Sequence, residues 1–336
     1  MSEPLLSAEN IVVRYRPTAH KLFTPGPLLT AVDRVSFELA AGETLGIVGE
    51  SGCGKSTLAR ALLGLVPVAE GRIRFSGQTL GHRTQRAMRP WRRAMQIIFQ
   101  DPVASLDPRM TAGEIIAEPL EFFEPGLAEG ERRQRVLAIM EKVGLGSDVR
   151  ARYPHEFSGG QCQRIGIARA LIGGPQLVIC DEPVSALDVS IRAQIINLLK
   201  GLQQELGLAL IFIAHDLSVV RHISHRVLVM YLGRVAECAA TDDLFGSPCH
   251  PYTRALIRSM PVASVGKHAA NHVATSTDIP SAANPPSGCR FRTRCEFAED
   301  VCIAEEPALR GWGENRVACH RLEHIFSDAG PGKGHS

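Results

Sequence analysis

Apolar and polar positions follow two different periods along this chain. Residues 11–15 and 31–40 alternate between apolar and polar side chains, as strands do. Residues 191–206 carry apolar side chains three or four positions apart, which is the spacing of one helix face, and Gly207 is expected to end this helix. Continuous apolar runs, typical of buried strands, cover residues 44–48, 95–99, 177–180 and 208–214. The pattern predicts an α/β fold.

A further helical region is expected between residues 111 and 145, where the apolar positions again have the helical period. Breaks are expected at Pro119, Pro125 and Gly126, because proline and glycine interrupt helices. An earlier segment, residues 71–77, is expected to form a strand and a turn.

The apolar run 44–48 leads directly into a glycine-rich loop with the pattern GxxxxGK[ST]. The loop consists of Gly49, Glu50, Ser51, Gly52, Cys53, Gly54, Lys55, Ser56 and Thr57. Glycines let backbone N–H groups surround an anion, and a helix that begins near Lys55 adds its positive N-terminal end. Lys55 is expected to reach the β- and γ-phosphates of a nucleotide, and the Ser56 hydroxyl to bind Mg²⁺. The loop therefore predicts a nucleotide site.

Polar side chains follow the other three buried strands. Gln100, the pair Asp181 and Glu182, and His215 each come directly after one of them. Open α/β sheets bind ligands at the carboxyl ends of their strands, so we expect these groups near the phosphates. Gln100 would reach Mg²⁺ or a water molecule, Asp181 would hold the Mg²⁺ shell, and Glu182 would deprotonate the attacking water. His215 is expected to contact the γ-phosphate, with a purely structural histidine as the alternative.

A second glycine pair opens a predicted helix at Ser158, Gly159, Gly160 and Gln161. Ser158 is a suitable N-cap, and the glycines leave backbone N–H groups bare at the start of the helix, which makes a second anion site. Two phosphate cradles in one chain are expected to face each other across a dimer.

Tyr15 is an aromatic residue at the end of the first predicted strand. It has two interpretations: it stacks on an adenine base, or it is an ordinary strand aromatic. The local pattern does not separate them.

Composition limits the function classes. With 45% hydrophobic residues the chain can bury a large core, and no apolar run approaches the roughly 18 residues of a membrane span, so any membrane role is expected to be peripheral. The N-terminus has no signal-peptide layout, so the nine cysteines are expected to be thiols or metal ligands in a reducing cytosol. The net charge of +2 does not indicate a positive electrostatic field that would attract nucleic acid. The arginine cluster 83–93 is interpreted as a solvated face rather than a nucleic-acid patch, since Trp91 is its one aromatic residue.

These motifs, in this order, resemble the nucleotide-binding subunit of ATP-binding-cassette (ABC) transporters across roughly residues 8–258. The resemblance identifies the Walker A loop with 49–57, the Q-loop with Gln100, the signature motif with 158–161, Walker B with 181–182, the D-loop with 185–188 including Asp188, the H-loop with His215 and the adenine-stacking A-loop with Tyr15. Phe157, where many members have leucine, and Cys162, where close relatives have a charged or longer polar residue, depart from the pattern. The second departure puts the surface chemistry of the signature helix in doubt.

The resemblance implies a P-loop NTPase fold of the ABC type. It would have a RecA-like core sheet, an N-terminal antiparallel β subdomain, a helical subdomain near residues 104–173 that carries the signature motif, and a small Cys-rich C-terminal extension. The ATPase domain would occupy about residues 1–258. A linker would follow at 259–288, the Cys-rich region at 289–323 and a disordered tail at 324–336.

Further residues narrow the resemblance to importers of dipeptides and oligopeptides. They are the insertion 17–27, the segments 153–155, 230–234 and 250–253, and the cysteines that follow. This branch implies ATP and Mg²⁺ as ligands, a paralogous ATPase subunit as heterodimer partner, two transmembrane permeases, and an extracytoplasmic peptide-binding protein that acts through them. The chain would lie at the cytoplasmic face of the inner membrane and bind no nucleic acid. Nickel and glutathione importers are close kin, so the substrate rests on resemblance alone.

Two other classes share these motifs. A DNA-repair or chromosome-organising ATPase would insert long coiled coils between the Q-loop and the signature motif, but only residues 101–157 lie between them, without sustained heptads. A translation-associated ATPase would carry two cassettes in one chain, and one Walker A loop is present. The importer interpretation is therefore preferred.

Four cysteines lie near the C-terminus: Cys289, Cys295, Cys302 and Cys319. A segment this small usually needs a metal or crosslinks to fold, and disulfides are not expected in the cytosol. Zinc, a [4Fe–4S] cluster and free thiols remain open, although the spacing lacks the close pairs of structural zinc knuckles. The resemblance implies the [4Fe–4S] cluster in a structural role. The charges of Arg290, Arg292 and Arg294 would offset part of its negative charge.

Cys53 lies inside the glycine-rich loop, beside a helix N-terminus and Lys55. These conditions lower the pKa of a thiol and predict a reactive cysteine. A buried and inert thiol is the alternative.

Overall fold

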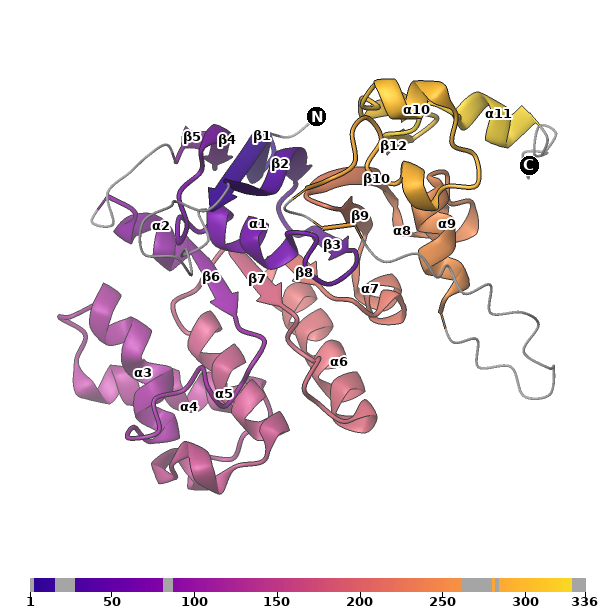
Figure 1. Cartoon of the computed structure of the whole chain (residues 1–336). Coiled ribbons are helices and arrows are strands. Elements are labelled where there is room, and N and C mark those ends of the chain that lie inside the picture. Colours follow the sequence, from indigo (N-terminus) through magenta and orange to yellow (C-terminus); the bar gives the residue numbers. More distant parts are fainter. Residues whose placement is uncertain (1–2, 16–27, 81–86, 261–279, 282–283, 328–336) are drawn as a thin grey trace, which may run out of the picture.

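A computed structural model describes residues 3–15, 28–80, 87–260, 280–281 and 284–327. The chain forms two β-sheets with helices around them (Figure 1). Within these ranges no helix combines the length and the apolar character needed to cross a membrane. The predicted insertion 17–27 lies outside the described residues.

The smaller sheet is antiparallel, with the strand order β2-β1-β4-β5. Its strands are β1 (Leu6–Tyr15), β2 (Leu29–Leu39), β4 (Glu70–Phe75) and β5 (Gln78–Thr79). Ile11 of β1 and Val35 of β2 are buried in one core with the apolar face of helix α1 (Lys55–Leu62). The two predicted strands are confirmed. The predicted alternation is seen in β2 from Val35 to Leu39, but not in β1, where Ile11, Val12 and Val13 are all buried.

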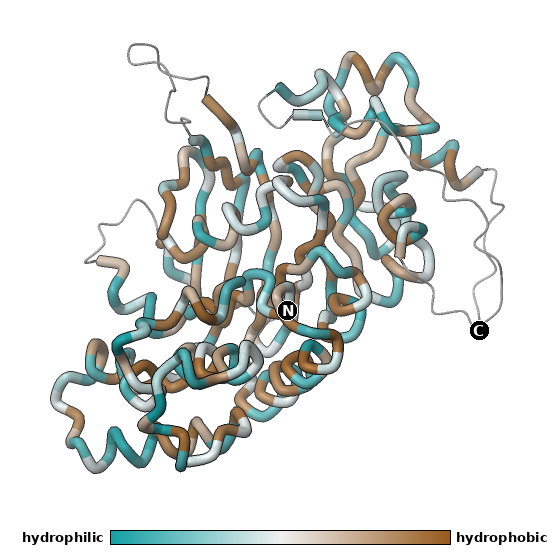
Figure 2. Tube along the Cα trace, turned by 60° about the horizontal axis from the view of Figure 1, so that its bottom comes forward, coloured by the Kyte–Doolittle hydropathy of each residue, from teal (hydrophilic) through white to brown (hydrophobic). Residues whose placement is uncertain are grey.

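The larger sheet has the strand order β11-β12-β10-β9-β3-β8-β7-β6. Its parallel part contains β3 (Thr44–Val48), β6 (Met95–Ile98), β7 (Leu177–Asp181), β8 (Ala209–Ile213) and β9 (Arg226–Tyr231). In β7, Leu177 and Ile179 belong to the core shared with β1, whereas Val178 and Cys180 belong to a second core shared with the helical subdomain. Burial on both faces explains the continuous apolar runs, and Figure 2 shows such brown segments inside the body.

The helical subdomain lies below this sheet in Figure 1. It contains α3 (Ala112–Phe123), α4 (Glu129–Lys142), the short 3₁₀ helices η1 (Ser147–Ala151) and η2 (Pro154–Glu156), and α5 (Gly159–Leu171). The predicted break at Pro119 is wrong, since Pro119 lies inside α3. Ile115, Ile116 and Leu120 of α3 are buried, and this packing outweighs the hydrogen bond that proline cannot donate. The helix ends before Pro125 instead, as expected for a residue that disfavours helix before it.

Further helices surround the larger sheet. They are α2 (Arg89–Ala94), α6 (Val189–Leu206), α7 (Leu217–Ile223), α8 (Thr241–Gly246) and α9 (Pro251–Arg258). The predicted end of α6 is confirmed, because Gly207 caps this helix in the left-handed conformation with φ 63°.

The C-terminal residues 284–327, called the appendage below, fold against the larger sheet. They contain η3 (Arg292–Arg294), α10 (Asp300–Ala304), β11 (Arg310–Trp312), β12 (Asn315–Val317) and α11 (Leu322–Ser327). β12 pairs in antiparallel fashion with β10 (Arg234–Ala240), Val317 opposite Glu237, so the appendage adds two strands to the core sheet. Residues 324–327, expected to begin a disordered tail, are helical in α11, and 328–336 lie outside the described residues.

Candidate active site

The glycine-rich loop joins β3 to α1, and its backbone requires glycine. Gly49, Gly52 and Gly54 have φ angles of 152°, 78° and 106°. A Cβ atom on Gly49 would lie 2.1 Å from the backbone oxygen of Met230, and one on Gly54 would lie 2.2 Å from that of Ala31. Gly54 is also the N-cap of α1 and supplies no side-chain cap, so the first N–H groups of the helix remain available to a ligand. The loop is therefore suited to an anion at the positive end of the helix dipole.

Lys55 and Ser56 are the first two residues of α1, and their side chains make different contacts. The Lys55 side chain is buried, and its Nζ donates to the backbone oxygens of Gly49 at 2.7 Å and Glu50 at 3.0 Å. Ser56 Oγ donates to Oδ1 of Asp181, at the end of β7, at 2.8 Å. Burial raises the pKa of Asp181, and the hydrogen bond from Ser56 opposes that rise. A hydroxyl beside a carboxylate is an oxygen donor set that suits Mg²⁺.

Two polar side chains, Gln100 and His215, approach the carboxylate of Glu182 from neighbouring strand ends. Gln100 Nε2 donates to Glu182 Oε2 at 2.9 Å, and His215 Nδ1 lies 3.7 Å from the same oxygen. Glu182 has a left-handed backbone, with φ 50°, and its N–H donates to the carbonyl of Ile213 in β8. The His215 side chain is 58% exposed and that of Glu182 18% exposed, so the group lies at the rim of the sheet within reach of solvent. A carboxylate held in this way can orient a water molecule and accept its proton.

The glycine pair at the start of α5 has a reciprocal cap. The Ser158 hydroxyl accepts from the Gln161 N–H at 3.3 Å, and the Gln161 side chain accepts from the Ser158 N–H at 3.0 Å, which confirms the predicted N-cap. A Cβ atom on Gly160 would lie 2.6 Å from Ile191, so glycine permits the close approach of α6. Neither capping bond reaches the glycine-rich loop of the same chain.

Two family models match the chain. The model described as ABC transporter covers residues 32–185, and the model described as Oligopeptide/dipeptide transporter, C-terminal region, covers residues 236–302. The Oligopeptide transport ATP-binding protein OppF of Escherichia coli (strain K12) is 54% identical over 302 residues, which cover 90% of this chain and 90% of that protein. The chain belongs to the family of ABC transporter ATP-binding subunits. Its activity is accordingly ATP hydrolysis coupled to transport.

Other comparisons agree with this family. OppF of Haemophilus influenzae (strain ATCC 51907 / DSM 11121 / KW20 / Rd) is 52% identical over 324 residues, covering 95% of this chain and 98% of that protein. Among solved structures, the dimeric post-hydrolysis state of the ATP-binding cassette MJ0796 bound to ADP and Pi is 28% identical, with a TM-score of 0.63 over 70% of this chain and 98% of that chain. CbiO1 from Clostridium perfringens, part of the ABC transporter complex cbiONQ, is 26% identical with the same TM-score. The expected ABC-type α/β fold is confirmed.

In this ABC ATPase the residues predicted for Walker A, Walker B, the Q-loop and the H-loop lie at one sheet edge, whereas no contact among the described residues tests the roles predicted for Tyr15 and Asp188. Tyr15 ends β1 and packs, partly buried, at the margin of the core around α1. Asp188 is the N-cap residue of α6 and makes no side-chain capping bond. Their expected roles toward adenine and a second subunit stay predictions.

Cys53 does not have the environment that the sequence predicted. Its side chain is 3% exposed and belongs to the core around α1. Burial raises the pKa of the Cys53 thiol, and the nearby charge of Lys55 lowers it by less. The prediction of a lowered pKa is wrong, because desolvation of the thiolate outweighs the lysine and the helix end.

The four C-terminal cysteines are free thiols gathered inside the appendage. Burial raises the pKa of Cys295 to about 12, and Cys319, Cys289 and Cys302 add to that rise, so the four thiols lie close enough to interact. The Arg321 N–H donates to Cys319 Sγ at 3.3 Å, and backbone N–H groups donate to the sulfurs of Cys289 and Cys295 as well. Across the described ranges, however, no three His, Cys, Asp or Glu side chains are placed to hold one metal ion. The donor chemistry fits a thiolate-bound metal centre, and its presence stays a prediction.

Two residues contact the Walker A loop although the sequence predicts no such contact. Tyr252 lies in a segment that resembles the peptide importers, and Arg294 was expected to offset the charge of a cluster but pairs with Glu50 instead. The Tyr252 hydroxyl, from α9, accepts from the Glu50 N–H at 2.9 Å. Arg294, from the appendage, donates to both carboxylate oxygens of Glu50. Both lie more than 200 residues from Glu50 in the chain, so only the fold brings them to the loop.

Proposed function

We propose that this ABC ATPase drives the import of oligopeptides across the cytoplasmic membrane, with Glu182 as its general base. The observation that carries the catalytic part is the convergence of Gln100 and His215 on the Glu182 carboxylate, beside the Ser56–Asp181 pair. The names of the related proteins, oligopeptide transport ATP-binding proteins, support the substrate class.

Each residue has one task in the proposed reaction. Lys55 exchanges the loop carbonyls that it now contacts for oxygens of the β- and γ-phosphates. Ser56, Asp181 and Gln100 hold Mg²⁺, which when bound neutralises developing phosphate charge. Glu182 takes a proton from the attacking water.

The other residues complete the site. His215 contacts the γ-phosphate and orients the attacking water together with Glu182. Tyr15 stacks on the adenine. The remaining Walker A residues bind ATP, chiefly through backbone N–H groups; they are Gly49, Glu50, Ser51, Gly52, Cys53, Gly54 and Thr57.

The second half of each site comes from another ATPase subunit. The start of α5, from Ser158 to Gln161, offers N–H groups to a γ-phosphate bound in trans, and Asp188 lies in the adjacent D-loop. The close packing of Gly160 against Ile191 of α6 fixes the start of α5, and the Walker A loop of a partner subunit would bind the phosphate that these N–H groups meet. We propose a paralogous ATPase subunit as that partner.

A groove between the core and the helical subdomain supports docking of a permease. It encloses about 310 Å³ and is lined by Leu63, Leu65, Arg92, Met95, Gln96, Ile97, Glu118, Pro119, Phe122 and Phe123. The Leu65 and Phe122 side chains are 47% and 49% exposed. We propose that an apolar helix segment of a permease covers them and that the chain thereby lies peripherally at the cytoplasmic face of the inner membrane. Two permeases, and through them an extracytoplasmic peptide-binding protein, complete the complex.

Reconstitution of the complex in liposomes tests this function. The ATPase rate is measured with di-, tri- and pentapeptides, with glutathione and with Ni²⁺, each delivered with the binding protein. Stimulation by the peptides alone is expected. Stimulation confined to glutathione or Ni²⁺ would reassign the substrate, and absence of hydrolysis in every case would refute the motor role.

We further propose that Cys289, Cys295, Cys302 and Cys319 hold a [4Fe–4S] cluster, with zinc as the alternative. The mutual proximity of the four thiols and the backbone N–H donors to their sulfurs support four thiolate ligands. The cluster would brace the appendage and take no part in hydrolysis. Anaerobically purified protein should contain iron and equal acid-labile sulfide, and colourless protein with stoichiometric zinc would refute the cluster.

We propose domain boundaries that follow these roles. The ATPase domain occupies about residues 1–258 and its helical subdomain about 104–173. Residues 259–288 connect it to the Cys-rich region 289–323. The pairing of β12 with β10 supports a C-terminal region that is docked on the ATPase domain rather than tethered to it.

A further inference from the structure

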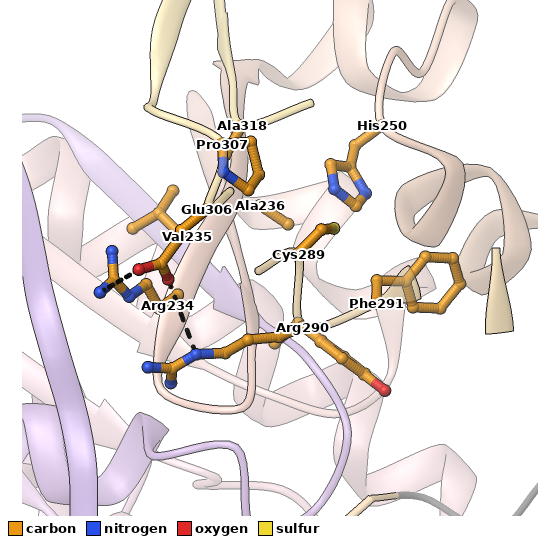
Figure 3. Close-up of a pocket in the computed structure, with 11 residues that line it drawn as sticks. Arg234, Val235, Ala236, His250, Cys289, Arg290, Phe291, Glu306, Pro307 and Ala318 are labelled. Atoms are coloured by element: carbon orange, nitrogen blue, oxygen red, sulfur yellow. Dashed lines mark ion pairs between the residues drawn. The ribbon is translucent and has the colours of Figure 1, made fainter. Parts of the chain in front are cut away.

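The appendage is fixed to the ATPase core by a network of four charges. Arg290 and Arg234 both form ion pairs with Asp33 of β2, and both approach Glu306. Arg234 Nη2 lies 2.9 Å from Asp33 Oδ2 and 2.7 Å from Glu306 Oε2. Figure 3 shows Arg234 and Arg290 converging on Glu306 beneath Cys289. The network holds the first turn of the appendage against β2 and β10.

Phe291, the next residue, anchors the appendage in an aromatic cluster. Its ring centroid lies 5.3 Å from that of Tyr231 and 5.4 Å from that of Tyr252, and Phe291 is 4% exposed. Tyr252 also receives the Glu50 N–H on its hydroxyl. One face of the cluster thus touches the appendage, and the other touches the Walker A loop.

Arg294 completes the connection. Its Nη1 donates to Glu50 Oε1 at 2.8 Å and to Oε2 at 2.9 Å, and the two side chains are 9% and 19% exposed. The guanidinium is held over the rings of Tyr231 and Phe291, at 5.9 Å and 5.6 Å from their centroids. Glu50 is therefore held at its backbone by α9 and at its side chain by the appendage.

This contact has an electrostatic consequence for an anionic ligand. Glu50 is the acidic residue of the loop that surrounds the phosphates, and an unpaired carboxylate there would repel them. Since the pair is largely withdrawn from water, the charge of Arg294 offsets that repulsion more strongly than an exposed pair would. Lys55 Nζ donates to the backbone oxygen of the same Glu50, so the position of Glu50 also sets where the lysine ammonium lies.

We propose that Arg294 is a positioning residue of the ATP site, through which the appendage presets the Walker A loop for nucleotide binding. The link is reciprocal: a nucleotide that orders the loop also orders the segment from Cys289 to Cys295. The C-terminal appendage is thereby a regulatory element of nucleotide affinity, in addition to any structural part it has in the complex.

Variants of the full chain test the positioning role. In Arg294→Gln the affinity for a fluorescent ATP analogue should fall, and the KM for ATP in the complex should rise, each by at least about fivefold. The kcat should change little, because the catalytic carboxylate is untouched. Arg294→Lys should recover part of the affinity. The matched control is Arg292→Gln in the same 3₁₀ turn, since among the described residues Arg292 bonds to Ser287 of the appendage.

A double-mutant cycle with Glu50→Gln assigns the effect to the pair. Arg294→Gln should cost affinity in the wild-type background and little in the Glu50→Gln background. Equal costs in both backgrounds, or a loss of thermal stability and kcat with an unchanged KM for ATP, would overturn the proposal and leave Arg294 with a structural role only.

A measurement on the unaltered chain covers the case in which a variant does not fold. Hydrogen exchange of the peptide spanning 289–302 is followed with and without ATP in the absence of Mg²⁺, which prevents turnover. Slower exchange with ATP is the expected result. Identical exchange, with protection seen in the Walker A peptide, would show that the loop and the appendage are not coupled and would overturn the proposal.

Discussion

The Gln100 amide donates at 2.9 Å to the one oxygen of Glu182, Oε2, that also lies nearest His215. The amide comes from the end of β6 and the carboxylate from the end of β7, which are neighbouring parallel strands. The register, with Ile98 opposite Cys180, brings the two segments that follow these strands side by side. Both contacts are made to Oε2 of Glu182, so in the proposed reaction Oε1 would accept the proton from water.

Replacement of Glu182 by glutamine should abolish catalysis and spare binding. The amide cannot accept the proton, so kcat should fall by about 10²–10⁴-fold, whereas the phosphates still meet Lys55 and the loop. ATP should then hold the two ATPase subunits together, as measured by native mass. Glu205→Gln, at an exposed pair with Lys142, is the control. Normal hydrolysis by the Glu182 variant would exclude it as the base.

The proposed permease groove predicts a variant that uncouples transport from hydrolysis. Phe122→Asp replaces a half-exposed apolar side chain of α3, which packs against the Arg89 guanidinium, by a carboxylate. We expect the affinity of the isolated chain for ATP to be unchanged and the peptide-stimulated ATPase rate of the complex to fall by about tenfold or more, since the carboxylate would lose its water when a permease segment covers it.

The matched control for Phe122 is Ile303→Asp, which changes a side chain of equal exposure on the appendage. Its complex should assemble and respond to peptide normally. If the Phe122 variant copurifies with the permeases and responds to peptide like the control, the groove is not the docking site.

Local patterns in the sequence were enough to predict which residues gather at the carboxyl ends of the parallel strands, where the candidate active site lies. Each buried strand is short and mainly apolar; Asp181 is the last residue of β7, and Gln100 and His215 each lie two residues past the end of β6 and β8. Because parallel strands end at a common edge, the order of the chain predicts which groups meet. The Walker A loop was equally predictable, since its glycines have positive φ angles or closely approach other backbone atoms, which other residues rarely allow.

Features that depend on distant packing were not predictable. Pro119 stays helical because α3 is buried on one face, and Cys53 has a raised pKa because the core closes over it. β11 and β12 have three residues each, too few for a strand pattern, and join the sheet only through β10. Arg294 and Glu50 lie 244 positions apart in the sequence, and no local pattern around either residue predicts their contact.

Cys53 should be an unreactive thiol in the folded protein. Its side chain is 3% exposed and burial raises its pKa, so little thiolate is present or accessible at neutral pH. Iodoacetamide should therefore modify Cys53 only as fast as the protein unfolds, and ATP should slow it only through added stability. Mass spectrometry of the Cys53 peptide, with a denatured sample as reference, measures this. Rapid alkylation of the native chain would contradict it.

His250 should make the protein sensitive to acid. Burial lowers the pKa of His250 from 6.5 to about 4, while its Nδ1 accepts the Tyr252 N–H at the start of α9. Because the unfolded chain binds the proton first, this stabilisation is complete above about pH 6.5 and is lost as the pH falls toward 4, by roughly 3 kcal/mol in total. His250→Asn keeps a capping acceptor without titrating, and Glu237, which accepts the His250 N–H, is unchanged in it. Urea unfolding at a series of pH values should show the wild type losing about that much relative to the variant. His155→Asn, which removes an exposed imidazole, controls for the loss of a histidine, and parallel curves for wild type and His250→Asn would refute the assignment.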